Sequence, residues 1–245
     1  MERVSQTRVA LITGAGRGIG RATAVGLAQE GFALCIASRT REQLEETRRL
    51  SGLASELSLI VLVDLAELDA PDNVFGAVME HFGRLDVLIN NAGFAPPRTP
   101  LPKIAPRDQD RMIAINLRAP IALARLAAIQ MARQREGGMI VNVASTAARS
   151  TPPGEAIYAA TKAGLVAFTR ACAAEFRDKR VRTTVILPGL TDTSFIPQHK
   201  RLDRSAMLRP EDIAAAVIGV LNTPSSICPV ELVLEPAREP MRFGS

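Results

Sequence analysis

The chain has 245 residues, of which 47% are hydrophobic and 22% are charged, and this composition excludes a disordered protein. Its 17 glycines and 16 prolines exclude collagen-like or low-complexity sequence, and its length is common for one α/β domain. Lys and Arg exceed Asp and Glu by 30 to 25, but the basic clusters contain or adjoin acids and hold no aromatic residues, so we expect no nucleic-acid partner.

Apolar runs of strand length alternate with segments of helical length along the whole chain. The expected strands are 8–13, 33–38, 58–63, 85–89, 139–144, 181–187 and 230–234. The expected helices are 18–30, 41–50, 67–82, 107–135, 156–177 and 210–221. Near-continuous apolar strands suit a sheet that is buried on both faces. The alternation therefore predicts a single-domain, doubly wound α/β fold over residues 1–245, with a parallel seven-stranded sheet and helices on both faces (a Rossmann fold).

A glycine-rich stretch, TGAGRGIG at residues 13–20, joins the first expected strand to the first expected helix. Glycines there allow a tight turn and let the backbone approach a pyrophosphate, which then lies at the positive N-terminus of the helix. A purely structural turn is the alternative, but this position in an alternating chain is the one that a dinucleotide site requires. The residues expected to bind the cofactor here are Gly14, Gly16, Arg17, Gly18, Ile19 and Gly20.

The end of the second expected strand bears on which dinucleotide binds. An acidic residue there would bind the ribose 2′-hydroxyl of NAD, but Ser38 and Arg39 stand at this point and no carboxylate follows before residue 42. Arg39 can instead pair with a 2′-phosphate through its planar donor fork, and Arg17 could approach the same phosphate. Ordinary solvated arginines are the alternative. We therefore expect NADP(H), with NAD(H) less favoured.

The single tyrosine, Tyr158, is followed four residues later by Lys162 on an expected helix. Side chains at this spacing project from one face, so the phenol and the ammonium can share a site. Hydride transfer to a carbonyl creates an alkoxide that must take a proton. A phenol has an ordinary pKa of about 10, and a nearby ammonium is expected to lower it.

Ser145 follows the expected strand 139–144, at the edge of the sheet where open α/β sheets bind their ligands. Its hydroxyl can donate to a carbonyl oxygen and hold it near the tyrosine. By itself such a serine is more often a cap or a turn residue, but Tyr158 and Lys162 together favour the functional interpretation.

With these residues in place, the chain resembles the short-chain dehydrogenase/reductase family, of the single-domain type, from Arg8 to about Leu221. The matching motifs are residues 13–20 (TGAGRGIG), Asp64-Leu65, residues 90–93 (NNAG), Asn116, Ser145, residues 158–162 (YAATK) and residues 188–193 (PGLTDT).

The resemblance implies a role for each of four catalytic residues. Tyr158 would be the general acid in reduction and the base in oxidation. Lys162 would bind the nicotinamide ribose and lower the pKa of the tyrosine. Ser145 would orient the substrate carbonyl, and Asn116 would hold a water that links Lys162 to solvent.

The resemblance also implies further contacts to the cofactor. Asp64 and Leu65 would meet the adenine. Asn91, Ala92 and Gly93 would line the adenosine side, while Asn90 is expected to tie neighbouring strands together. The residues expected to fix the nicotinamide carboxamide are Pro188, Gly189, Thr191 and Thr193.

The sequence thus predicts an NADP(H)-dependent oxidoreductase that interconverts a small carbonyl compound and a secondary alcohol. A loop at about residues 190–207 is expected to line the substrate pocket, together with residues 94–101 and 147–157, where Arg98 and Arg149 could meet an anionic group. The alternatives are an NAD-dependent alcohol dehydrogenase of the same family and a non-catalytic NADP(H)-binding sensor.

The last expected strand lacks the Gly-Gly pair with which tetrameric members of the family often end it. We therefore expect a homodimer through the two long helices rather than a homotetramer through this edge.

Three scattered cysteines, Cys35, Cys172 and Cys228, show no CxxC spacing, so buried thiols in a reducing compartment are expected. His81 and His199 are isolated, and no metal site is expected. The N-terminus shows no signal peptide, and no apolar run approaches the roughly 18 residues of a membrane span. The chain is expected to be cytoplasmic, without a membrane partner.

Overall fold

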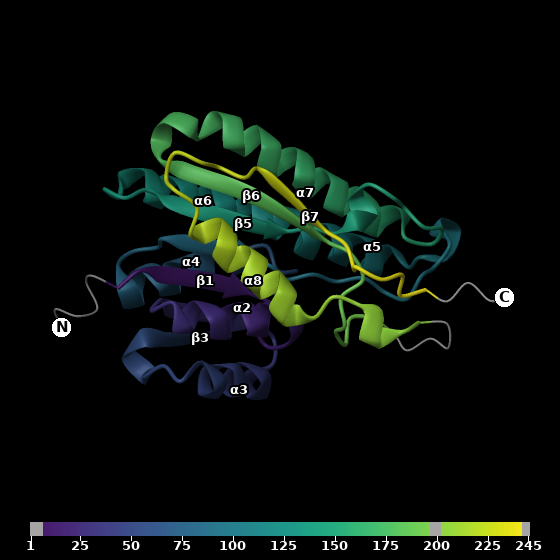
Figure 1. Ribbon diagram of the computed structural model, residues 1–245, viewed down its shortest axis with the longest axis horizontal. Helices are drawn as coiled ribbons and strands as arrows, with labels where there is room; N and C mark the ends of the chain where they lie inside the picture. The colour runs from purple at the N-terminus through teal and green to yellow at the C-terminus, as the bar shows by residue number, and fades with distance from the viewer. Residues whose placement is uncertain (1–6, 197–201, 242–245) are drawn as a thin grey trace.

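Seven parallel strands form one sheet in the computed structural model, which describes residues 7–196 and 202–241 (Figure 1). The strands are β1 (Val9–Thr13), β2 (Ala33–Ser38), β3 (Ser58–Leu62), β4 (Val87–Asn90), β5 (Gly138–Val143), β6 (Val181–Pro188) and β7 (Glu231–Leu234). Their order is β3-β2-β1-β4-β5-β6-β7, which confirms the predicted sheet. The order reverses between β1 and β4, and this is where ligands bind in doubly wound sheets.

Helices cover both faces of the sheet. The helices α2 (Gly18–Gln29), α3 (Arg41–Ser51) and α8 (Pro210–Leu221) pack on one face, and α4 (Ala70–Phe82), α6 (Ala119–Arg133) and α7 (Ala156–Glu175) on the other. Successive residues of β1 enter different cores: Val9 and Leu11 lie in one hydrophobic cluster, Ala10 and Ile12 in the other. This two-sided burial is the reason why the strands are apolar throughout.

The long helix predicted over residues 107–135 is continuous in space but not regular. It consists of α5 (Pro106–Ile113), a π-helical turn (Ala114–Arg118) and α6. Pro120 has no N–H to give to the carbonyl of Asn116, four residues earlier, which interrupts the regular ladder at this point. The sequence prediction missed this irregularity, and it also began the helix α4 too early, at residue 67 instead of Ala70.

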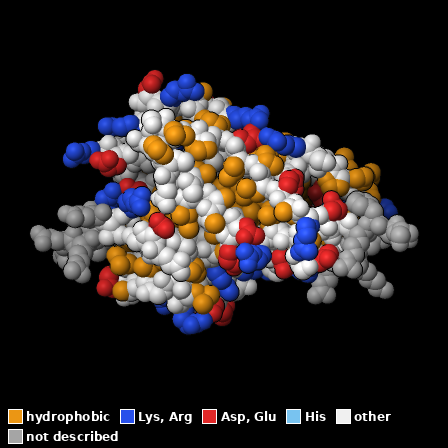
Figure 2. All heavy atoms as spheres, viewed as in Figure 1, with side chains coloured by type: hydrophobic (Ala, Val, Ile, Leu, Met, Phe, Trp, Pro, Cys, Tyr) orange, Lys and Arg blue, Asp and Glu red, His pale blue; other side chains and the backbone are white. Residues whose placement is uncertain are grey.

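The helical stretch Pro106–Arg133 is the one described segment that is long and apolar enough to cross a membrane, although charged residues such as Arg118 and Arg125 interrupt its apolar sequence. Its most apolar window is 56% buried inside the protein, as expected for a core helix that packs against a sheet. On the face shown in Figure 2, Lys and Arg side chains alternate with Asp and Glu instead of forming one basic patch.

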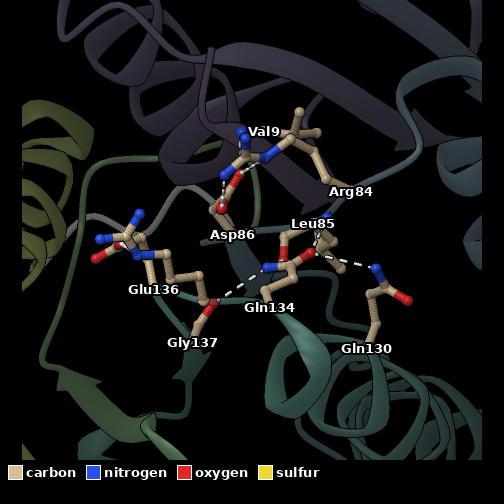
Figure 3. Close-up of polar contacts among 9 residues, drawn as sticks. Val9, Arg84, Leu85, Asp86, Gln130, Gln134, Glu136 and Gly137 are labelled. Carbon is tan, nitrogen blue, oxygen red and sulfur yellow. Dashed lines mark hydrogen bonds and ion pairs between the residues drawn. The ribbon is translucent and has the colours of Figure 1, made fainter. Parts of the chain in front are cut away.

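The amino ends of the central strands are tied together by two polar side chains (Figure 3). The buried carboxylate of Asp86 accepts from the backbone N–H of Val9 at 2.7 Å and from Nε of Arg84 at 2.9 Å. The amide of Gln134 accepts from the N–H of Leu85 at 3.1 Å and donates to its carbonyl at 2.9 Å. These contacts connect β1, β4 and the end of α6 at the edge opposite the predicted site.

The three cysteines are free thiols. Cys35 and Cys172 are buried as expected, whereas Cys228 is only half-buried and donates to the carbonyl of Thr183. Its position in the turn before β7 leaves one side of the residue open to solvent.

Candidate active site

The predicted catalytic residues gather at the carboxyl ends of the strands. Lys162, on the buried side of α7, donates from Nζ to the carbonyl of Val143 at the end of β5, at 2.9 Å. The ring of Tyr158, one turn earlier on α7, has its centroid 5.8 Å from the same nitrogen. Ser145 follows β5 directly. The i, i+4 spacing thus places phenol and ammonium on one side of the helix, beside the strand that carries the serine.

Ser145 acts as a cap and also contacts the tyrosine. Its Oγ accepts from the N–H of Ala147 at 3.1 Å and so caps the short 3-10 helix Thr146–Ala148. A hydrogen bond also joins its hydroxyl to the phenol of Tyr158. The capping bond fixes the rotamer of Ser145, so its hydroxyl is held next to the phenol before any ligand arrives.

Burial controls the ionisation of both groups on α7. It raises the pKa of Tyr158 to about 12, against the hydrogen bond from Ser145, and the charge of Glu155 raises it further. Burial lowers the pKa of Lys162 to about 8. Lys162 is not among the groups that shift the pKa of Tyr158 in this arrangement, in which its Nζ is directed to the Val143 carbonyl, so the expected lowering of the tyrosine pKa stays a prediction.

Asn116 is fully buried in the π-helical turn and fixes the loop after β4. Its amide donates to the carbonyl of Phe94 at 2.8 Å, and its Oδ1 accepts from the N–H of Phe94 at 2.8 Å. A Cβ on Gly93 would lie 3.7 Å from this oxygen and 3.9 Å from Nζ of Lys162. Asn116, Gly93 and Lys162 are thus neighbours, while the predicted water relay stays a prediction.

The glycine turn packs closely against the loop after β4. Gly14 has a φ of +66°, and a Cβ there would lie 2.8 Å from Cα of Ala92. A Cβ on Gly20 would lie 2.5 Å from Nδ2 of Asn91 and would overlap the carbonyl oxygen of Gly14. Nδ2 of Asn91 donates to the carbonyls of Thr13 and Gly14, at 3.0 and 3.2 Å. Only glycine fits these positions, which leaves the turn's backbone accessible to a pyrophosphate.

Arg21 supports the glycine turn, a role that the sequence analysis did not find. Its Nη2 donates to the carbonyls of Gly16 and Gln43, at 2.5 and 3.3 Å, and its Nε donates to Oγ1 of Thr47 at 3.2 Å. Gln43 and Thr47 lie on α3, more than 20 residues away in sequence. No local sequence pattern predicts a contact between residues so far apart in the chain.

Arg39 and Asp64 lie near each other at the adenosine end. Arg39 is exposed after β2, and its charge contributes to lowering the pKa of Asp64. Burial alone would raise that pKa, but a 2.7 Å hydrogen bond from Nη2 of Arg111 and one from the N–H of Ala66 outweigh it. The Asp64 carboxylate is therefore ionised, and the positive charge of Arg111 on α5 partly balances it. Arg111 is a second residue that sequence reasoning missed.

A groove of about 470 Å³ lies outside this end of the site. It is lined by Ala66, Arg107, Asp108, Asp110, Arg111, Ala114 and Arg118. None of the predicted catalytic residues lines it, and its arginines and aspartates largely balance each other. It adjoins the predicted adenine contacts through Arg111.

The segment after β6 reaches the glycine turn from the other side. The N–H of Gly189 donates to the carbonyl of Leu234 at 2.7 Å, and the hydroxyl of the buried Thr191 donates to the carbonyl of Gly189. A Cβ on Gly18 would lie 3.2 Å from Cγ2 of Thr193. The predicted nicotinamide contacts and the predicted pyrophosphate contacts thus meet across Gly18.

Three loops surround Tyr158 where the substrate is expected. The N–H of Thr99 donates to the carbonyl of Gly154 at 3.1 Å, and the ring of Phe195 lies 6.1 Å from that of Tyr158. Residues 197–201 of the expected substrate loop lie outside the described residues. Arg98 is paired with Glu155, and Arg149 with Glu231, so neither guanidinium is held ready for an anionic substrate.

The arrangement fits a nicotinamide dinucleotide, because the tight glycine turn, the exposed basic residue after β2 and the buried lysine lie at one edge of the sheet. In the described part of the chain, no three of the His, Cys, Asp or Glu side chains gather as metal ligands would.

The sequence profile of the short chain dehydrogenase family matches residues 8–203. The chain belongs to this family. It is an oxidoreductase with the single-domain, dinucleotide-binding Rossmann fold of that family, as the sequence predicted.

Individual relatives agree with this membership. The chain is 36% identical to an uncharacterized oxidoreductase of Thermotoga maritima over 77% of its own length and 73% of the relative. It is 32% identical to a 3-oxoacyl-(acyl-carrier-protein) reductase of the same organism, over 89% of this chain and 92% of the relative.

Solved structures of the family have the same fold. An alcohol dehydrogenase from Thermococcus sibiricus, complexed with 5-hydroxy-NADP, has a TM-score of 0.84 at 28% identity and covers 97% of this chain and 100% of its own. A 3-ketoacyl-(acyl-carrier-protein) reductase from Brucella melitensis, complexed with NADH, has a TM-score of 0.85 at 28% identity, over 94% and 98%. These relatives support a nicotinamide cofactor for this short chain dehydrogenase, without distinguishing NADP from NAD.

Proposed function

We propose that this short chain dehydrogenase is an NADP(H)-dependent carbonyl reductase, or the corresponding alcohol dehydrogenase, acting on a small ketone or secondary alcohol. The observation that carries the proposal is the grouping of Ser145, Tyr158 and Lys162 at the carboxyl end of β5, next to the glycine turn.

The chemistry follows from the state of these side chains. Bound nicotinamide supplies or accepts the hydride. The Ser145 hydroxyl orients the carbonyl oxygen, and the Tyr158 phenol, protonated at neutral pH, donates its proton to that oxygen as the carbonyl carbon is reduced. In oxidation the proton returns to Tyr158. The Lys162 ammonium would hold the nicotinamide ribose, and Asn116 keeps the loop at Gly93 next to Lys162.

The preference for NADP(H) rests on charge at the end of β2. Arg39 is exposed there, no carboxylate occupies residues 38–41, and the nearby Asp64 is paired with Arg111. A 2′-phosphate would therefore meet a positive rather than a negative side chain.

The test measures binding of NADPH and of NADH separately by fluorescence, and then oxidation of each with a panel of ketones. We expect tighter binding of NADPH and turnover of at least one ketone. Turnover with NADH alone would favour the NAD-dependent alternative. Tight binding without turnover on any carbonyl or alcohol would favour the non-catalytic sensor.

Arg39→Asp tests the cofactor assignment directly. The substitution places a carboxylate where NAD enzymes have one, so the ratio of NADPH to NADH affinity is expected to fall by about tenfold or more. Arg49→Asp, in the last turn of α3 and away from the end of β2, is the matched control for charge. An unchanged ratio in Arg39→Asp would show that this residue does not select the cofactor.

We further propose that the chain forms a homodimer through the outer sides of α6 and α7, with a homotetramer as the alternative. A cytoplasmic location is proposed as well, since the apolar helical stretch Pro106–Arg133 is mostly buried against the sheet.

A further inference from the structure

The guanidinium of Arg204 binds three residues of the segment that follows Thr191. Its Nε donates to Oδ1 of Asp192 at 2.7 Å, its Nη2 to the carbonyl of Thr193 at 2.9 Å, and its Nη1 to the carbonyl of Ile196 at 3.3 Å. Arg204 itself is the first residue of the short 3-10 helix Arg204–Ala206. One side chain therefore spans the segment from its beginning to Ile196.

The segment that Arg204 holds touches both halves of the proposed site. The methyl group of Thr193 faces Gly18 of the glycine turn, and the ring of Phe195 lies 6.1 Å from the ring of Tyr158. Phe195 is 41% exposed although it is a large apolar residue, so one side of it is free to contact a ligand next to the phenol.

Backbone bonds alone fix only the start of this segment. The N–H of Asp192 donates to the carbonyl of Leu208 at 2.7 Å, and the N–H of Leu208 to the carbonyl of Leu190 at 3.0 Å. Further along, in the part of the chain that the structure describes, the hydrogen bonds that reach residues 193–196 from outside come from the Arg204 guanidinium.

The base of the Arg204 turn is itself anchored. The N–H of Asp203 donates to the carbonyl of Pro240 at 2.8 Å, and Nη2 of Arg238 donates to the carbonyl of Ser205 at 2.9 Å. The C-terminal segment after β7 thus supports the turn from which Arg204 reaches across. Among the residues that the structure describes, Arg204 thus connects a supported turn to a segment that receives no other hydrogen bond from outside.

We propose that Arg204 is a positioning residue of this enzyme: it holds Thr193 against the glycine turn and Phe195 beside Tyr158, and so preorganises the nicotinamide end of the site. The proposal rests on the proposed dinucleotide-dependent function.

The physical basis is the planar fork of arginine. Three N–H groups of one guanidinium act at once in fixed directions, which the point charge of lysine does not reproduce. The ion pair with Asp192 is partly exposed and contributes little by itself. Without the fork, residues 193–196 must be ordered when the cofactor binds, and this ordering cost weakens binding at the nicotinamide end.

Loss of the Arg204 side chain is expected to affect binding of the two ends of the cofactor differently. The adenosine end meets the glycine turn, Arg39 and Asp64, none of which contacts Arg204. A ligand that consists only of the adenosine half is therefore expected to bind independently of this side chain, whereas the whole dinucleotide is not.

The test compares NADPH with 2′,5′-ADP, which carries the adenosine half alone, by isothermal titration calorimetry. In Arg204→Gln and in Arg204→Lys we expect NADPH to bind about tenfold more weakly and 2′,5′-ADP to bind within about twofold of the wild type. The Lys variant keeps the charge and lacks the fork, so it distinguishes geometry from charge. Arg209→Gln, an exposed arginine paired with Asp212, is the matched control and is expected to leave both affinities unchanged.

Two results would overturn the proposal. Unchanged NADPH binding in both Arg204 variants would show that the segment does not depend on this side chain. Equal weakening of NADPH and 2′,5′-ADP, or loss of the folded state in Arg204→Gln with wild-type binding in Arg204→Lys, would show a general structural role instead.

Cofactor binding by the wild type distinguishes a failure of the Arg204 proposal from a failure of the proposed function. If it binds NADH and AMP instead, the choice of NADP(H) is wrong and the same comparison is made with that pair. If it binds neither dinucleotide, the proposed function and this inference both fail.

Discussion

Tyr158 and Lys162 show how burial sets the state of a reactive side chain. The phenol keeps its proton at neutral pH because burial raises its pKa to about 12, and Ser145 opposes this only in part. A protonated phenol beside the expected carbonyl is ready to act as an acid. The Tyr158 phenol is therefore in the protonation state that the proposed reduction requires.

Replacing Tyr158 by Phe removes the proton donor and little else. We expect Tyr158→Phe to lower kcat by about a hundredfold or more, the scale of general acid catalysis, because the ring keeps its packing against Phe195. The dissociation constant of NADPH is expected to stay within about twofold. Steady-state kinetics and cofactor titration measure both quantities, and full turnover in this variant would remove the phenol from the mechanism.

Lys162 makes the stability of the fold depend on pH. Its pKa is about 8 in the folded chain against an ordinary 10.5, so between these values the unfolded chain binds more protons than the folded one. The free energy of unfolding therefore rises with pH across this window, and below it the buried charge destabilises the fold.

Lys162→Met is the variant that tests this sign. Relative to it, the wild type is expected to gain about 2 kcal/mol of unfolding free energy between about pH 7 and about pH 9.5. Urea titrations of both proteins at about pH 7 and about pH 9.5 measure the difference. Parallel pH profiles would mean that Lys162 titrates as in the unfolded chain.

At the scale of elements, glycine is required by packing in the helix α2 and is not required in the helix α4. Gly20 lies in the first turn of α2, where a Cβ would collide with Asn91 and with the backbone of the glycine turn. Gly76, in the middle of α4, has no neighbour within 4 Å of such a Cβ. The first glycine is required by close approach. The second only adds flexibility to a helix.

Alanine at each position tests the contrast. Gly20→Ala is expected to destabilise the fold by about 1–3 kcal/mol through overpacking and to weaken NADPH binding at least about tenfold. Gly76→Ala is expected to stabilise it by about 0.5–1 kcal/mol and to leave binding unchanged. Thermal unfolding and cofactor titration of the pair decide, and tolerance of alanine at residue 20 would contradict the tight turn.

Over the whole molecule, the two edges of the sheet have different tasks. At the amino edge, Asp86 and Gln134 connect strand ends and the end of a helix through buried or partly buried hydrogen bonds (Figure 3). At the carboxyl edge, the glycine turn, Ser145 and the segment after β6 leave polar groups available for ligands. Polar side chains thus connect structural elements at the amino ends of the strands, whereas the groups of the proposed site lie at the carboxyl ends.

The proposed dimer is tested on the outer side of the long helical stretch. Ile113, Ile121 and Ile129 are 41%, 36% and 45% exposed, and α7 exposes the small residues Ala160, Ala163 and Ala167. Ile121→Glu is expected to convert the dimer to a monomer, because a buried unpaired charge opposes association. Sedimentation analysis gives the mass, with Leu50→Glu on α3, at the other face of the sheet, as the control. A monomeric wild type would contradict the proposal.

Much of the architecture was readable from the sequence, since strand-length apolar runs and the TGAGRGIG turn are local patterns that report burial on both faces. The i, i+4 spacing of Tyr158 and Lys162 likewise follows from helix geometry alone. The π-helical turn around Asn116 was missed, because it depends on how Pro120 and the loop at Phe94 meet that helix.

Local pattern in the sequence by itself therefore determined the alternation of strands and helices and the position of the glycine turn, and it supplied the candidate reactive side chains. Only the tertiary structure decided which partners Arg21, Arg111 and Arg204 take, because their contacts join residues 5 to 47 positions apart. It also decided that Lys162 faces Val143 and that burial governs both pKa values on α7. Desolvation and long-range hydrogen bonds depend on what surrounds a side chain in space, and a sequence pattern does not contain that information.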